Sequence, residues 1–140
     1  MTETLEPPAA APPVVPVWSP VTVAVYGLLL GFPAGVMLAL RNWRALGMRR
    51  EVRTHLAGAF VVALVIFFVL PRLVRYVSGG TSIAAFIYLK AKLRSDFEDA
   101  QPSVTLLYRP WYTALGWALL ADAAFILFAA VVTLVVCMLC

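Results

Sequence analysis

An uncharged apolar segment between Val21 and Leu40 carries small residues at every fourth position, and this pattern most restricts how the chain can fold. The series is Gly27, Gly31, Gly35 and Ala39. Residues four apart lie on one face of an α-helix, so this face would carry almost no side chain and another helix backbone could approach it closely. The segment therefore predicts a membrane-spanning helix built for close packing, either within the chain or on another chain.

The composition of the whole chain favours a membrane location. Of its 140 residues, 63% are hydrophobic and 13% are charged, whereas soluble domains are about half apolar and about a quarter charged. A chain of this length has room for one domain with three or four spans of about 20 residues each. We therefore expect an all-α membrane protein with three to four transmembrane helices.

Two regions of different character divide the chain. Residues 1–20 are rich in proline and carry only two charges, Glu3 and Glu6, so we expect an extended or disordered tail. Residues 21–140 form a single transmembrane domain in this interpretation. Its apolar runs predict spans at about 21–40, 56–74, 77–90 and 113–138.

Pro33 lies inside the first predicted span. A proline in a helix removes one amide hydrogen bond and frees a carbonyl four residues earlier, here that of Leu29. We therefore expect a helix that is kinked near Leu29 but continuous. Trp18 and Trp43 would lie at opposite ends of this span, where indoles favour the membrane interface.

A short basic loop follows the first predicted span. Its arginines are Arg41, Arg44, Arg49, Arg50 and Arg53. Basic residues near span ends stay on the cytoplasmic side of a membrane, so we interpret these arginines first as a topology signal. The alternatives are that this loop recognises lipid headgroups or binds nucleic acid. We expect the protein to contact anionic headgroups of the bilayer and not to bind nucleic acid.

The distribution of basic residues also selects the number of spans. If residues 77–90 form a short, tilted or partly re-entrant third span, nine Lys and Arg residues lie on the cytoplasmic side and two outside. Without that span, the division is five against six. Four helices are therefore favoured, with both termini on the outer, periplasmic side of a bacterial inner membrane.

Asp122 is the only charged residue in the last predicted span. An ionised carboxylate at that depth costs several kcal/mol, so the side chain should face protein or water, or be protonated. Ala114 and Ala118 place it on a face of small residues. We favour a neutral acid that hydrogen-bonds another helix, with the carbonyl of Leu29 at a similar depth. A proton relay, an ion ligand and a contact to a cofactor or subunit are the functional alternatives.

The remaining reactive residues do not form a recognisable catalytic or metal site. Cys137 and Cys140 form a C-x-x-C pair at a helix C-terminus, where the helix dipole does not lower a thiol pKa. The single His55 is expected on the opposite side of the membrane from the cysteines, so we expect no metal site; a labile disulfide between the cysteines is the minor alternative. The sequence shows no histidine and serine constellation, no paired carboxylates at workable spacing and no glycine loop for phosphates, so we expect no catalytic residue. We also expect no cofactor. The acidic cluster of Asp96, Glu98 and Asp99 is interpreted as a solvated charge run on a loop.

The segment Gly31-Phe32-Pro33-Ala34-Gly35 is followed by Asn42, by Leu46-Gly47 and by an apolar run that closes at Leu70-Pro71. In these features the first half of the chain resembles a group of short multi-pass bacterial membrane proteins of unknown function. The resemblance implies a location in the bacterial inner membrane and no particular activity.

The chain is small, has few polar residues in its predicted spans and carries faces suited to close packing. These features predict a non-catalytic structural or accessory subunit of a larger membrane complex, of photosynthetic or respiratory type. Its partners would be other integral membrane subunits and the lipid bilayer, including anionic headgroups. The main alternative is a small homo-oligomeric transporter or channel that uses Asp122. A membrane anchor for a soluble partner is the third.

Overall fold

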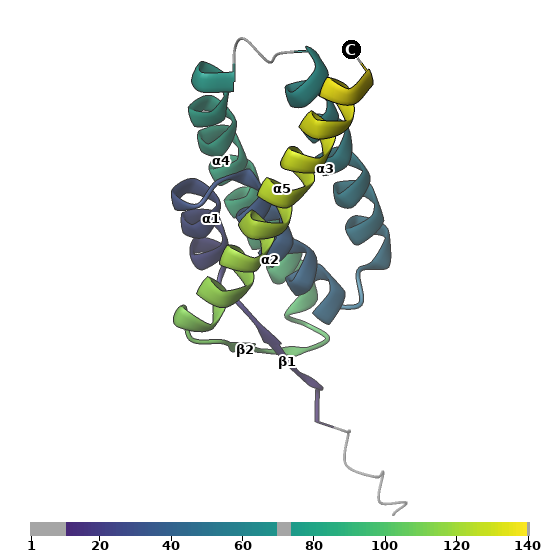
Figure 1. Ribbon diagram of the computed structural model, residues 1–140. Helices are drawn as coiled ribbons and strands as arrows, with labels where there is room; N and C mark the ends of the chain where they lie inside the picture. The colour runs from purple at the N-terminus through teal and green to yellow at the C-terminus, as the bar shows by residue number, and fades with distance from the viewer. Residues whose placement is uncertain (1–10, 70–73, 140) are drawn as a thin grey trace, which may run out of the picture.

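The computed structural model describes residues 11–69 and 74–139. The elements are β1 (Val14–Val17), α1 (Pro20–Leu29), α2 (Phe32–Ala45), α3 (Arg49–Val69), α4 (Val74–Ala100), β2 (Thr105–Tyr108) and α5 (Tyr112–Leu139). The long helices α3, α4 and α5 run the length of the molecule, and the shorter α1 and α2 lie among them (Figure 1). The β strands lie at the lower end of the helices in this view.

The prediction of an all-α protein with three to four transmembrane helices is wrong. The described residues form five helices, and these are accompanied by a parallel two-stranded sheet. Among the described residues, one helix is long and apolar enough to cross a membrane, namely α5 over Tyr112–Val135. The run at 21–40 is divided between α1 and α2, and 77–90 belongs to α4, whose C-terminal part is rich in charge. The run at 56–74 lies partly outside the described residues, and α3 begins with charged residues.

Gly31 interrupts the first apolar run and reverses the chain direction. Its φ of 106° and ψ of 172° belong to a region that only glycine adopts easily. Pro33 then lies in the first turn of α2, where a missing amide hydrogen costs nothing. The predicted kink in a continuous helix is therefore wrong, because Gly31 ends one helix and Pro33 starts the next.

The glycine series packs inside the chain, across the turn between α1 and α2. A Cβ atom added to Gly35 would lie 2.8 Å from Cα of Gly27 and 3.0 Å from Cδ1 of Leu89 on α4. In one continuous helix, Gly27 and Gly35 would be about 12 Å apart. The two glycines therefore allow close contact between the arms of a helical hairpin, Gly31 makes its turn, and Ala39 is buried in the core.

Part of the proline-rich segment is held by the sheet. β1 pairs in parallel with β2, with Val14 opposite Thr105 and Val17 opposite Tyr108. The amide of Arg109 donates a further hydrogen bond to the carbonyl of Val17, at 2.8 Å. The segment is extended at β1, as the prolines predict, but this extended part is paired rather than free; residues 1–10 lie outside the described residues.

The α1–α2 hairpin forms the centre of the molecule. Within the described residues, α2 packs against α1, α3, α4, α5 and β1. Large buried side chains at this centre include Trp18, Trp43, Leu38 and Leu93. The prediction that Trp18 and Trp43 mark opposite membrane interfaces is wrong, since both are buried and the hairpin brings them to the same end of the molecule.

Candidate functional site: an arginine-lined pocket

Asn42 joins the two ends of the α1–α2 hairpin. Its side-chain Nδ2 donates to the carbonyl of Trp18 at 2.8 Å, and its Oδ1 accepts from the amide of Trp18 at 2.9 Å. Only 1% of Asn42 is exposed. Because one buried side chain satisfies both backbone groups of Trp18, it fixes the start of α1 against the end of α2.

The indole ring of Trp18 is held from two further directions. Its Nε1 donates to Oγ1 of Thr113, near the start of α5, at 2.9 Å. The guanidinium carbon of Arg109 lies 5.0 Å from the ring centroid, which is within the range of a cation–π interaction. Trp18 therefore forms a rigid wall between β1, α2 and α5.

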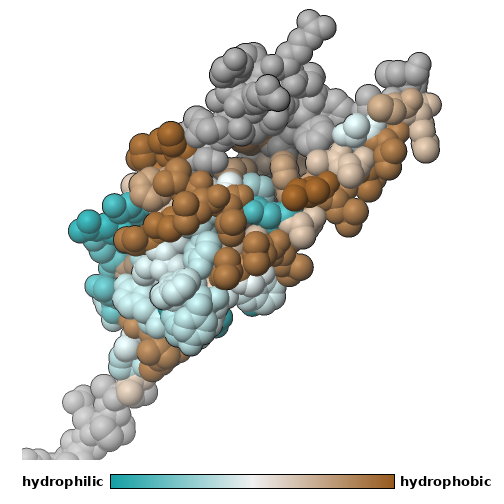
Figure 2. Space-filling view, turned by 60° about the vertical axis from the view of Figure 1, so that its left-hand side comes forward, coloured by the Kyte–Doolittle hydropathy of each residue, from teal (hydrophilic) through white to brown (hydrophobic). Residues whose placement is uncertain are grey.

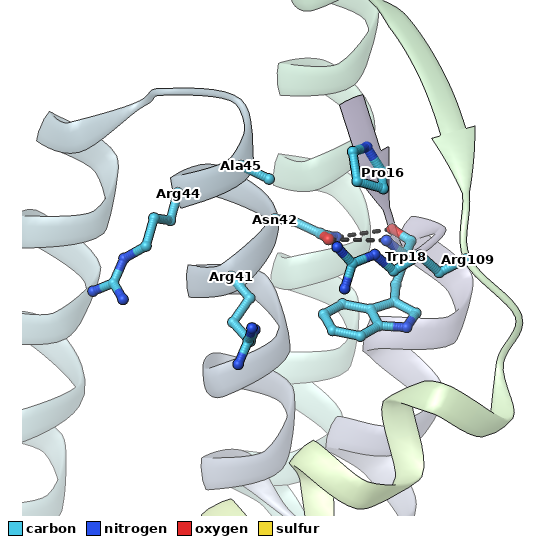
Figure 3. A pocket seen from close by; sticks show the side chains of 7 residues that line it. All are labelled: Pro16, Trp18, Arg41, Asn42, Arg44, Ala45 and Arg109. Atoms are coloured by element: carbon cyan, nitrogen blue, oxygen red, sulfur yellow. Dashed lines mark hydrogen bonds between the residues drawn. The ribbon is translucent and has the colours of Figure 1, made fainter. Parts of the chain in front are cut away.

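A pocket of about 260 Å³ opens beside this wall. It is lined by Pro16, Trp18, Arg41, Asn42, Arg44, Ala45 and Arg109. In Figure 3 the side chain of Arg109 reaches across Trp18 toward Asn42, whereas Arg44 points away from Asn42. The pocket is thus built by residues from β1 and α2 and by Arg109, which follows β2 directly.

Positive charge is concentrated at this pocket. Burial lowers the pKa of Arg41, and the positive charges of Arg109 and Arg44 lower it further. Ion pairs in the described part of the chain lie elsewhere, at Glu51–His55, Glu51–Lys92, Lys92–Asp96 and Arg94–Glu98. The guanidiniums of the pocket therefore have no carboxylate partner among the described residues.

The arginines predicted from the basic loop divide into two groups. Arg41 and Arg44 line the pocket, whereas Arg49, Arg50 and Arg53 belong to the first turns of α3 and are not among its lining residues. From the sequence, Arg109 was expected among the cytoplasmic basic residues and in an aromatic and basic cluster that anchors the last span at the membrane interface, but not as a pocket residue. The pairing of β1 with β2 brings it to the pocket from a distant part of the chain.

Asp96 is the centre of a second polar cluster, between α2 and α4. Only 3% of it is exposed; its Oδ2 accepts from Nε1 of Trp43 at 2.7 Å and its Oδ1 accepts from Nζ of Lys92 at 2.7 Å. The hydrogen bond to Asp96 raises the pKa of Lys92, and the charges of Asp96 and Glu51 act in the same direction against the effect of burial. The interpretation of Asp96 as a solvated residue on a loop is wrong, because it lies on α4 and faces the indole of Trp43.

His55 links this cluster to α3. Its Nε2 lies 2.7 Å from the hydroxyl of Tyr88, and its ring centroid lies 4.2 Å from that of Trp43. Its Nδ1 lies 2.9 Å from the carbonyl of Glu51. These contacts join α3 to α2 and α4. The described residues contain no group of three or more His, Cys, Asp or Glu side chains placed to hold a metal ion.

Asp122 lies on the inner side of α5. Ala114 and Ala118 of the same helix are fully buried, and Asp122 is half-buried one turn further along. Among the described residues, Asp122 makes no hydrogen bond to the carbonyl of Leu29, which was the predicted acceptor. Leu29 is exposed instead. Cys137 is exposed and free, and Cys140 lies outside the described residues.

Comparison of the chain with protein-family models, with curated proteins and with solved structures found no match.

Proposed function

We propose that this protein is a non-catalytic integral membrane protein that acts as a structural or accessory subunit of a larger membrane complex. The observation that carries the proposal is the surface of α5. Within Tyr112–Val135, only 6% of the most apolar 18-residue stretch is buried inside the molecule. A helix that is apolar on all sides is normally buried in a large core or surrounded by lipid, and the first condition does not hold for α5.

Apolar surface on neighbouring helices supports the same proposal. Large exposed side chains include Leu56, Phe60 and Val61 of α3 and Ile83 and Ile87 of α4. In Figure 2 brown, apolar surface extends across the middle and right of this face, and most of the teal and pale surface lies at its lower left. Extended apolar surface of this kind is typical of proteins that contact membrane or other subunits.

The charged end of the molecule indicates an orientation for this proposal. The first turns of α3, the end of α4 and the start of α5 lie at the same end, where Glu51 approaches Lys92 and Trp18 contacts Thr113. Basic residues favour the cytoplasmic side. Because α1 and α2 form a hairpin, β1 also lies at this end, so the proposed orientation places β1 on the cytoplasmic side and the C-terminal end of α5 outside. This proposal replaces the prediction from the sequence that both termini lie on the periplasmic side.

A pair of lysine substitutions tests whether α5 is inserted in a membrane. Ile126 lies near the middle of the apolar stretch and is 67% exposed, and Leu107 of β2 is 57% exposed. A lysine at the centre of a membrane helix costs about 2.5–3.5 kcal/mol, whereas a lysine on a water-exposed strand costs little. We expect Ile126→Lys to lose retention in membranes after alkaline carbonate washing and Leu107→Lys to keep it. Equal retention of both variants, or release of the wild-type chain, contradicts insertion.

Extraction of native membranes with a mild detergent tests the role as a subunit. The proposal predicts that the chain is recovered in a particle with larger integral membrane partners, identified by mass spectrometry. A purely monomeric particle contradicts it. A particle made only of copies of this chain, with a solute flux that Asp122→Asn abolishes, would support the transporter alternative instead.

A further inference from the structure

We propose that the pocket between Arg41 and Arg109 binds a phosphate group, either the headgroup phosphate of an anionic phospholipid or a free phosphate anion. The lipid source depends on the membrane location proposed above, whereas the pocket itself does not.

The charges in the pocket call for an anion. The fold brings Arg109 to Arg41 and Arg44 from a distant part of the chain, and within the described residues no carboxylate pairs with any of them. Burial lowers the pKa of Arg41, and the repulsion from the like charges of Arg109 and Arg44 lowers it further. A bound phosphate would reverse this repulsion.

The two guanidiniums are positioned by aromatic rings. The guanidinium carbon of Arg41 lies 3.4 Å from the ring centroid of Trp117, and that of Arg109 lies 5.0 Å from the ring centroid of Trp18. Stacking uses the flat face of a guanidinium and leaves its N–H edge available to donate to oxygen. Among the hydrogen bonds of the described residues, none is donated by the side chain of Arg41 or Arg109, so these edges are available to a ligand. Arginine binds phosphate well because two parallel N–H groups match two phosphate oxygens.

The walls of the pocket are ordered before any ligand binds. Asn42 holds both backbone groups of Trp18, Thr113 holds its indole, and the amide of Arg109 is bonded to Val17. Little conformational entropy would therefore be lost on binding. The pocket volume of about 260 Å³ leaves room for a phosphate with a small substituent.

The position of the pocket favours a lipid headgroup. Tyr108, Trp111 and Tyr112 are exposed just before and at the start of α5, and exposed aromatic residues at the end of an apolar helix are typical of the membrane interface. Arg109 belongs to this segment, so its guanidinium would lie at the depth of the headgroups.

Calorimetric titration of the full chain, freed of lipid in a neutral detergent, tests the proposal. The ligands are dihexanoyl phosphatidylglycerol, dihexanoyl phosphatidylcholine and inorganic phosphate. We expect the double variant Arg41→Gln/Arg109→Gln to weaken binding of phosphatidylglycerol or phosphate by about tenfold or more. The matched double variant Arg49→Gln/Arg53→Gln removes the same charge outside the pocket, and we expect a change of less than about twofold.

Each outcome of the titration has a defined meaning. Arginine-dependent binding of phosphatidylglycerol alone assigns the site to lipid, and arginine-dependent binding of inorganic phosphate assigns it to a free anion, even if the Ile126→Lys experiment excludes a membrane location. Failure of the wild-type chain to bind either phosphatidylglycerol or inorganic phosphate overturns the proposal, whether or not the chain binds phosphatidylcholine. Equal weakening by both double variants does so too, because it would show a general charge effect. If the pocket variant is unfolded by circular dichroism, Arg109→Gln alone replaces it, since Arg109 is only half-buried.

Discussion

Gly27 of α1 and Gly35 of α2 are in backbone contact across the central hairpin. A Cβ atom on Gly35 would approach Cα of Gly27 to 2.8 Å, and one on Gly27 would approach Cα of Gly35 to 3.1 Å. In both cases the obstacle is backbone, which cannot move aside as a side chain can. The contact sets how closely the arms of the hairpin approach, and thereby the position of the element against which the other helices pack.

Alanine substitutions in this series should have graded effects. We expect Gly35→Ala to destabilise the protein by about 1–3 kcal/mol, as overpacking of a core does, and Gly27→Ala to destabilise it less. Gly58→Ala and Gly116→Ala are the matched controls, because a Cβ there meets nothing within 4 Å among the described residues. Both are helical, so alanine should stabilise them by about 0.5–1 kcal/mol.

Reversible unfolding in mixed micelles measures these differences. A Gly35→Ala variant as stable as Gly58→Ala would show that the two arms are not in contact at this point.

Loss of the Asn42 side-chain amide should also be costly. In Asn42→Leu the buried amide and carbonyl of Trp18 lose their partners, and each buried unpaired group costs about 1–3 kcal/mol. We expect a loss of about 2 kcal/mol or more in the free energy of unfolding. The control is Gln101→Leu, which changes an exposed amide at the end of α4 and should stay within about 0.5 kcal/mol. Equal stability of the two variants contradicts the role of Asn42.

Stability at alkaline pH should depend on Lys92. Its pKa is raised in the folded protein by the hydrogen bond from its ammonium to Asp96. A raised folded-state pKa adds stability that is fully present below the ordinary lysine value of 10.5 and is lost as the pH rises through the higher folded value. We therefore expect the wild-type melting temperature to fall in this range more steeply than that of Lys92→Met. Lys90→Met, at an exposed position, should follow the wild-type curve; identical slopes for all three proteins would contradict the prediction.

The sequence predicted the elements that depend on local pattern. The last apolar run, expected at 113–138, corresponds to α5 at Tyr112–Leu139, because a long apolar stretch without a breaker has one local solution. The spacing of Gly27 and Gly35 predicted a helix face for close packing, and in the structure a Cβ on Gly35 would lie 2.8 Å from Cα of Gly27 itself. It could not show the direction of the chain after Gly31, since helical periodicity is the same for a continuous helix and for one that ends and turns back.

The pocket and the Asp96 cluster could not be predicted for a related reason. Arg109 reaches Arg41 through strand pairing between distant segments, and Asp96 is buried only because the hairpin places Trp43 opposite it. In both cases the partner is supplied by the tertiary fold. Locally, Asp96 belongs to a run of charges that is typical of an exposed surface.

The hairpin itself is tested most directly by one distance. Spin labels at positions 14 and 45, in a chain whose Cys137 and Cys140 are replaced by alanine, report on the separation between β1 and the end of α2. Val14 and Ala45 are exposed, and Pro16, two residues after Val14, lines the same pocket as Ala45. A hairpin predicts a single short distance by double electron–electron resonance. A distribution centred at about 35–40 Å or beyond, the length of a continuous helix from Pro20 to Ala45, would contradict it.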